Sequence, residues 1–268
     1  MFRAGFLLLT LSPLLAFGLE FQAEKPLSDA ATVPAAVSPA PDSGETAAPV
    51  KREALTSEKR GDIFMARKMY REAIEMYREM PPTAVTMNKI GIAYHQMVDM
   101  QAARRYYEKA IKLNPKYSEA VNNLGTVYYA NKSYGRAVRQ YQKALKLSPD
   151  SASVYSNLGT AYFARKKYKE AFEAYQEALK LDPDVFEHRG SYGVLLQERN
   201  VEERARFHFY LAKTYAKSGM TDRALLYVRK ALEEGFKERN RFLEDPEFTP
   251  LKDNPEFKQL MTQEPRVL

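Results

Sequence analysis

The chain has 268 residues, of which 45% are hydrophobic and 28% charged, and its formal net charge is +7. This length and composition fit one sizeable helical domain or two small ones. The sequence contains no cysteine, which excludes disulfide bonds, thiolate metal sites, a cysteine nucleophile and an acylated-cysteine anchor. Residues 1–18 carry +1 from Arg3, and residues 19–54 carry −3 from three basic and six acidic residues, so the remainder from 55 onward carries +9. The positive charge therefore belongs to the part that is expected to fold.

The first 18 residues have the pattern of an export signal. Arg3 precedes an apolar run that ends at Gly18, and the small residues Ala16 and Gly18 stand at the positions before a signal-peptidase cut. The run has about 15 residues, fewer than the roughly 20 needed to span a bilayer. The sequence therefore predicts a cleaved signal at 1–18 and a periplasmic or extracellular protein, with an uncleaved anchor as the alternative.

A linker is expected after this signal. Residues 19–54 contain nine Ala and five Pro, and the prolines leave no helical or strand period. Such a composition is typical of a disordered, partly extended tether.

A period of 34 residues governs the centre of the chain, where 84–117, 118–151 and 152–185 align without gaps. Seven positions match in register in each segment, with Ile90 in the first segment where the other two have Leu124 and Leu158. In the second segment they are Leu124, Gly125, Tyr128, Ala137, Tyr141, Ala144 and Pro149.

These positions predict a pair of closely packed helices. Gly125 and Ala137 remove side-chain bulk, so the two helices can approach, and Pro149 ends the second helix. The seven-position pattern resembles the tetratricopeptide repeat, which implies an all-α, right-handed superhelical solenoid of antiparallel helix pairs. Less regular copies at 54–83 and 205–238 extend the predicted repeat domain to 55–238.

The period breaks at 186–204. Asn200 and Glu203 have the spacing of a helix start with reciprocal capping. We expect an inserted loop with a short helical turn before this start. Two roles remain open for it: a flap over the binding groove, or a diverged half-repeat that only packs.

A short sequence pattern that occurs twice in the C-terminal segment, 239–268, predicts two small helices. Asp245 and Asn254 are each followed by Pro-Glu-Phe, the pattern of an N-cap and a proline in the first turn. We expect these helices to cover the last face of the solenoid, with a docking motif as the alternative. Together with residues 231–236, this tail resembles the ends of exported bacterial repeat proteins.

The tetratricopeptide resemblance implies that the first helix of each pair lines a concave groove that binds another protein. Asparagine both donates and accepts hydrogen bonds, which suits an extended peptide or a partner helix, and aromatic residues suit apolar anchors. The alternative is that the asparagines only bond across neighbouring helices. The predicted partner-binding residues are Asn88, Asn122, Asn123, Thr126, Tyr129, Ser156, Asn157, Thr160, Phe163 and Tyr210.

Some members of the family grip a terminal carboxylate with paired Lys and Asn residues. Here Asn123 and Asn157 match the asparagine, but Glu119 and Ser153 stand at cationic positions. This departure argues against a carboxylate clamp.

A basic stripe follows the second helices. Its cations are spaced by four and three residues, which puts them on one helical face. This stripe supports an alternative function, in which a convex surface docks the protein on an anionic lipid or polymer, although an ordinary solvated face has the same pattern. The stripe consists of Arg105, Lys109, Lys112, Arg139, Lys143, Lys146 and Lys180.

We predict that the protein is not an enzyme. Its three histidines, His95, His188 and His208, form no metal-binding motif, and no phosphate-cradling glycine loop or nucleophile elbow is present. The sequence predicts no catalytic residue, no metal and no cofactor. It also predicts no nucleic-acid partner, because no stacking aromatic residues interleave with the basic stripe.

Overall fold

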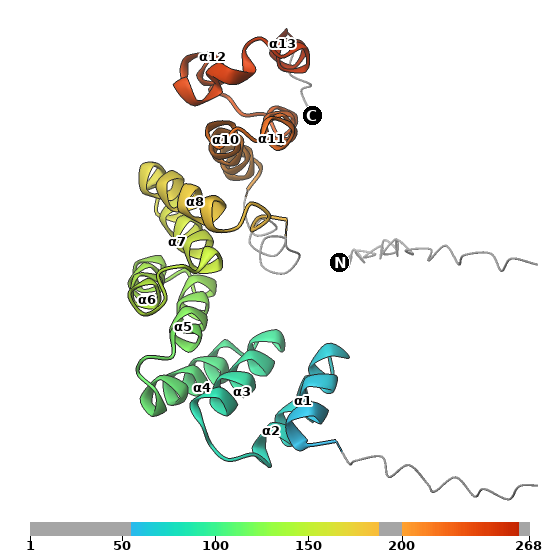
Figure 1. The fold of residues 1–268 in the computed structure, drawn as a ribbon, viewed down its shortest axis with the longest axis vertical. Coiled ribbons are helices and arrows are strands. Elements are labelled where there is room, and N and C mark those ends of the chain that lie inside the picture. The colour runs from blue at the N-terminus through green and yellow to red at the C-terminus, as the bar shows by residue number, and fades with distance from the viewer. Residues whose placement is uncertain (1–54, 188–199, 263–268) are drawn as a thin grey trace, which may run out of the picture. The chain divides into compact units, whose positions relative to one another are not determined.

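The computed structural model describes residues 55–187 and 200–262, and the regular structure in these ranges is helical (Figure 1). The predicted signal at 1–18 and linker at 19–54 lie outside the described residues. In chain order the elements are α1 (Ser57–Ala66), α2 (Tyr70–Arg78), α3 (Ala84–Gln96), α4 (Met100–Leu113), α5 (Ser118–Ala130), α6 (Tyr134–Leu147), α7 (Ala152–Ala164), α8 (Tyr168–Leu181), α10 (Val201–Lys217), α11 (Thr221–Glu233), α12 (Arg241–Glu244), the 3-10 helix η1 (Pro246–Leu251) and α13 (Pro255–Thr262).

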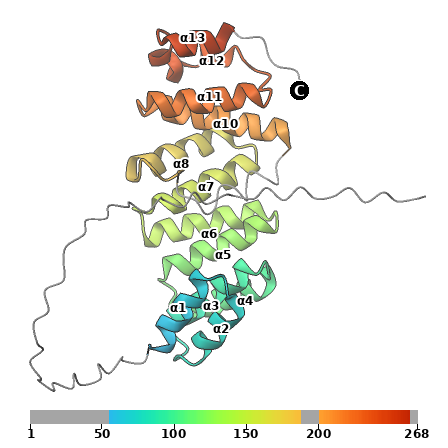
Figure 2. The ribbon, with the colours of Figure 1, turned by 90° about the vertical axis from the view of Figure 1, so that its right-hand side faces the viewer.

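Consecutive helices form pairs, and each pair packs on the next. Helix α3 packs on α4, α5 on α6, and α7 on α8, while α4 contacts α5 and α6 contacts α7. Figures 1 and 2 both show each pair beside the following one. The predicted all-α fold of packed helix pairs is confirmed. The less regular copies are also helix pairs, α1 with α2 and α10 with α11.

The turns within the pairs share one backbone feature. In each turn one residue adopts a left-handed conformation, as in Lys132 with φ of 56° and Gly219 with φ of 71°. This conformation reverses the chain after the first helix and lets the turn bond back to it. In the third pair, Ser133 donates its backbone N–H to the carbonyl oxygen of Tyr128 at 2.8 Å.

The start of α10 agrees with the predicted helix boundary. The backbone N–H of Glu203 donates to Oδ1 of Asn200 at 2.8 Å, which is the N-cap half of the expected capping box. Residues 201–204, counted in the predicted insertion, are already helical. On the other side, Val185 and Phe186 are buried. Residues 188–199, which hold the rest of the predicted flap or half-repeat, lie outside the described residues.

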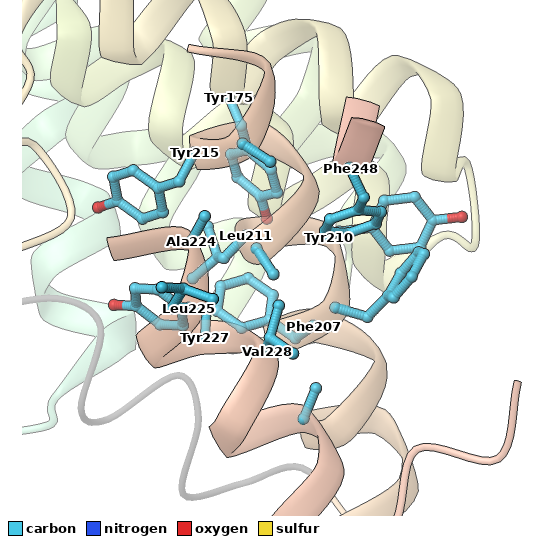
Figure 3. Packing of buried hydrophobic residues seen from close by; sticks show 14 of the residues in the cluster. Tyr175, Phe207, Tyr210, Leu211, Tyr215, Ala224, Leu225, Tyr227, Val228 and Phe248 are labelled. Atoms are coloured by element: carbon cyan, nitrogen blue, oxygen red, sulfur yellow. The ribbon is translucent and has the colours of Figure 1, made fainter. Parts of the chain in front are cut away.

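The C-terminal segment forms the short helices that were expected, with α12 in addition. Asn254 caps α13 by accepting the backbone N–H of Phe257 at 3.2 Å. Phe248, Phe257 and Leu260 are buried in the same cluster as residues of α10 and α11. Figure 3 shows Phe248 near Tyr210, within a core that also holds Phe207, Leu211, Tyr215, Leu225 and Val228.

Candidate functional site

The predicted binding residues occupy α3, α5, α7 and α10, the first helices of four pairs. Their exposure divides them into two groups. Asn122, Asn123, Thr126 and Asn157 are partly exposed. The other six are buried: Asn88, Tyr129, Ser156, Thr160, Phe163 and Tyr210.

The four asparagines form a hydrogen-bonded ladder across three repeats. Asn123 donates Nδ2–H to Oδ1 of Asn88 at 3.0 Å, and Asn157 donates to Oδ1 of Asn122 at 3.1 Å. A longer bond of 3.5 Å from Asn122 to Oδ1 of Asn123 joins the two halves. The structure therefore brings the predicted asparagines together, and their side chains form hydrogen bonds between neighbouring first helices.

The ladder ends in two residues, Tyr117 and Glu119, that were not among the predicted partner-binding residues. Asn88 donates to Oε1 of Glu119 at 3.0 Å and to the hydroxyl of Tyr117 at 3.3 Å. Tyr117 in turn donates to Glu119 at 2.8 Å. Burial raises the pKa of Tyr117 to about 12, and the Glu119 carboxylate adds to this effect. Their place in the sequence could have indicated this role, because Tyr117 and Glu119 lie just before Asn122 and Asn123, the asparagines of the next repeat.

The hydroxyl groups of Thr126 and Thr160 form hydrogen bonds to the backbone of their own helices. Thr126 donates Oγ1–H to the carbonyl oxygen of Asn122 at 3.3 Å, and Thr160 donates to that of Ser156 at 2.9 Å. The hydroxyl of Tyr175 in α8 also donates to Thr160, at 3.3 Å. Ser156 and Thr160 are 3% and 2% exposed, so neither offers a polar group to a partner.

The predicted aromatic anchors pack between repeats, away from solvent. Phe163 lies edge-on to Phe207 at 5.4 Å and to Tyr210 at 6.0 Å between ring centroids. Tyr210 stacks on Tyr168 at 5.2 Å, and Tyr129 packs on Tyr134 at the same distance. With exposed fractions of 4–9%, Phe163, Tyr210 and Tyr129 are parts of the core in this structure.

The helices that carry the ladder, α3, α5 and α7, expose few side chains fully. These lie near the helix ends and were not among the predicted binding residues. They are Val85, Gln96, Glu119, Ala130 and Ser153.

The basic stripe lies on the second helices, as its spacing predicted. All seven of its cations are exposed. Lys180 is paired with Glu177 at 2.6 Å. Lys109 lies 4.7 Å above the ring of Tyr106. The stripe is therefore a second candidate surface, separate from the ladder.

Within 55–187 and 200–262, no group of three His, Asp or Glu side chains is placed to hold a metal ion. None of the helices in these ranges is both long and apolar enough to cross a membrane.

The match to a protein-family model agrees with the helix pairing. The family model described as "Tetratricopeptide repeat" matches residues 46–116 and 116–184, just over half of the chain. No curated protein sequence matches the chain. A crystal structure of MamA is 23% identical and covers 65% of this chain and 93% of that one, with a TM-score of 0.46. A MamA structure from Desulfovibrio magneticus RS-1 is 21% identical over 66% of this chain and 92% of that one, with a TM-score of 0.47.

Proposed function

The chain belongs to the tetratricopeptide repeat family, and we propose that it is a non-catalytic protein-interaction scaffold that binds an extended peptide or a partner helix. The proposed binding surface is the ladder face, defined as the exposed and partly exposed side chains of α3, α5 and α7. The observation that carries this proposal is the asparagine ladder. It places the partly exposed amides of Asn122, Asn123 and Asn157 on α5 and α7 and ties them to the buried Asn88 of α3.

The ladder leaves hydrogen-bonding capacity for a ligand. A primary amide has two N–H donors and an oxygen with two lone pairs. Among the described contacts, Asn123 and Asn157 each use one N–H in the ladder. The remaining groups can pair with the backbone of an extended segment, which offers a donor and an acceptor at each residue. The ladder bonds hold the amides in fixed orientations, which lowers the entropy cost of binding.

Site-specific photo-cross-linking tests the surface without removing a ladder bond. A photoreactive residue replaces Ala130 on α5 or Ser153 on α7, both exposed on the ladder face. The matched control places it at Gln259, exposed on α13, outside both the ladder face and the second helices. Cross-links to one protein from Ala130 and Ser153, but not from Gln259, support the proposal. Cross-links from Gln259 alone place the partner on the C-terminal helices and overturn it.

A second test blocks the same surface. The variant Ala130→Arg with Ser153→Arg adds two long side chains and retains every asparagine. We expect it to abolish capture of the cross-linked partner, while Gln259→Arg retains capture. Unchanged capture by the double variant would contradict binding on the ladder face.

We also propose that the scaffold works in the cell envelope or outside the cell. The support is the pattern of residues 1–18, with Arg3 before an apolar run and small residues at Ala16 and Gly18. Expression of the full chain in a bacterium with an active signal peptidase tests this. A periplasmic chain that begins at Leu19 supports export and cleavage, whereas a cytoplasmic chain that retains residues 1–18 contradicts it.

A further inference from the structure

The positive charge of the second helices is concentrated in two of them. Helix α4 carries four cations and one acidic residue, and α6 carries four cations and no acidic residue. The neighbours differ: α2 carries two of each sign, and α8 carries two cations and three acidic residues. The excess of positive charge is therefore found on α4 and α6 and is not shared by the neighbouring second helices α2 and α8.

One cation of α4 and one of α6 lie against the same ring. Arg104 of α4 and Arg136 of α6 approach Tyr128 at 5.6 and 5.8 Å from its ring centroid. Each helix also carries a row of three exposed cations at spacings of four and three residues, which puts them on one face of that helix. The rows are Arg105, Lys109 and Lys112 on α4, and Arg139, Lys143 and Lys146 on α6.

These six cations form no ion pair among the described residues. The contrast with the neighbouring helices is direct, since Arg78 of α2 pairs with Glu75 at 2.9 Å and Lys180 of α8 with Glu177 at 2.6 Å. On α4 the single acid, Glu108, is bound to Arg104 at 2.8 Å. Like charges at helical spacing repel one another. An anionic ligand on this surface would relieve that repulsion.

Apolar groups accompany the charges. An open hollow of about 380 Å³ is lined by Gln142, Leu145 and Lys146 of α6. At the ends of the two rows, Leu113 and Leu147 are 54% and 36% exposed. The surface therefore offers cations and a recess for an apolar side chain within one turn of each other.

We propose that this surface, the α4–α6 face, binds an acidic segment of a protein partner that carries an apolar residue among its Asp and Glu side chains. The charges select the sign of the ligand, and the recess beside Leu145 and Lys146 takes the apolar side chain. The hollow favours a peptide over a lipid bilayer, because one side chain of a peptide can enter it, whereas a flat bilayer surface would bridge it. Each row is about 10 Å long, the length of about three extended residues, so a segment of about six to eight residues has the length of two rows.

This inference deepens the proposed function and rests on it, because it assumes a protein-binding scaffold. It adds a second surface, on the opposite helix of each pair from the asparagine ladder. A partner that binds the ladder face can thus reach the α4–α6 face with a separate acidic segment.

Fluorescence anisotropy of the full-length chain with a labelled peptide tests the proposal. The probe is a peptide of about eight Asp and Glu residues with one central leucine. One control peptide has serine in place of the leucine, and another has lysine in place of the acids. Vesicles of phosphatidylglycerol, measured by co-sedimentation, test the lipid alternative.

Two charge-matched variants locate the site. The first is Arg139→Glu with Lys143→Glu and Lys146→Glu. The control is Arg60→Glu with Lys169→Glu and Lys252→Glu, three exposed cations that likewise form no ion pair among the described residues. We expect the first to weaken peptide binding at least about tenfold and the control to change it less than about twofold. Should the triple variant lose its helical circular dichroism, Lys143→Glu alone is expected to weaken binding about threefold.

The outcomes are decisive for this surface. Binding of the acidic leucine peptide that falls with serine, with the α6 variant and at high salt supports the proposal. Absence of peptide binding, equal loss in both triple variants, or binding to vesicles without binding to the peptide overturns it. Cross-linking from Ala130 and Ser153 reports on the ladder face independently, so failure of the acidic site and failure of the scaffold function give different results.

Discussion

The ring of Tyr141 occupies the space that a side chain at Gly125 would need. A Cβ atom at Gly125 would lie 2.6 Å from Cε1 of Tyr141, closer than such atoms approach without a shift. Tyr141 is 2% exposed and fixed in the core between α5 and α6. The same relationship recurs in three other pairs: Gly61 with Tyr77, Gly91 with Tyr107, and Gly159 with Tyr175.

Gly125→Ala should therefore destabilise the protein, although alanine is the better helix former. Overpacking of this kind costs about 1–3 kcal/mol, which exceeds the gain in helix propensity of about 1 kcal/mol or less. The control is Gly135→Ala in α6, where a Cβ meets nothing within 4 Å and a gain of about 0.5 kcal/mol is expected. Urea unfolding measures both. Stabilisation by both substitutions would show that the tyrosine ring does not impose the glycine.

Val98 has a strained backbone conformation. At the equivalent turn position, the other repeats have lysine or glycine, for which this conformation costs less. The φ of Val98 is 62°, in the left-handed region, where Lys68, Lys132 and Lys166 also lie and where Gly219 stands in the last pair. A β-branched side chain is disfavoured there more than a lysine. Val98→Gly should raise the free energy of unfolding by about 1 kcal/mol, since the 74% exposed side chain loses little packing.

The matched control for Val98 is an exposed valine with helical backbone. Val85 in α3 is 46% exposed, and Val85→Gly should lower stability by a few tenths of a kcal/mol, about the difference in helix propensity. Thermal unfolding of both variants checks the sign. A lower melting temperature for Val98→Gly would mean that the turn is not strained at this residue.

The helix pairs could be predicted from sequence because the contacts that form each pair lie within a single repeat. Gly125 and Tyr141 are 16 positions apart within one repeat, so the 34-residue period exposes their pairing directly. Asn254 could be identified as a cap because it precedes Pro255 and an acidic residue in the first turn. Each of these inferences needs only the geometry of one helix pair.

The site residues depended on how one repeat sits on the next, which the period does not give. Asn123 bonds Asn88 because the sixth position of one repeat reaches the fifth position of the preceding one. The burial of Tyr210 required the packing of Phe163 and Tyr168 from the preceding pair. Sequence spacing placed these residues on the expected helices but could not tell a groove-lining aromatic ring from one buried between repeats.

The ladder predicts a measurable coupling between Asn88 and Asn123. In a double-mutant cycle with alanine at each position, we expect a coupling energy of about 0.5–1.5 kcal/mol, because the bond is direct and Asn88 is only 1% exposed. The control cycle combines Asn123 with Asn114, which is exposed and caps its own turn. That pair should be additive within about 0.5 kcal/mol. Additivity of both cycles would show that the ladder bond contributes no stability.

The C-terminal cap predicts a large effect from one aromatic residue. Phe248 is 0% exposed and packs on Phe209 and Phe242, with centroid distances of 5.7 and 5.1 Å. Phe248→Ala should lower the free energy of unfolding by about 3–5 kcal/mol, because it leaves a cavity among rings that cannot all collapse. Leu243→Ala, at a side chain that is 49% exposed, should change it by about 0.5 kcal/mol or less. Equal effects would mean that the cap is not docked in solution.

His208 makes stability depend on pH above the range in which carboxylates titrate. Burial lowers the pKa of His208 below its ordinary value of 6.5, and this effect outweighs the attraction of Glu234, whose Oε2 lies 2.7 Å from Nδ1. Arg204 and Lys230 also face the ring and disfavour its protonation. Burial lowers the pKa of His95 in the same direction. Below pH 6.5 the unfolded chain therefore binds more protons at these two histidines than the folded chain does.

The expected result is a loss of stability as the pH falls from about 7.5 to about 5.5, through the unfolded pKa of the histidines and toward the lower folded values. Asp62 and Asp245 also have pKa values lowered from 3.8, but their contribution is lost only in more acidic solution. Urea unfolding across this range compares the native chain with His95→Gln/His208→Gln. The variant should show a flatter dependence on pH. A native chain that gains stability on acidification would show that the Glu234 carboxylate, and not burial, governs His208.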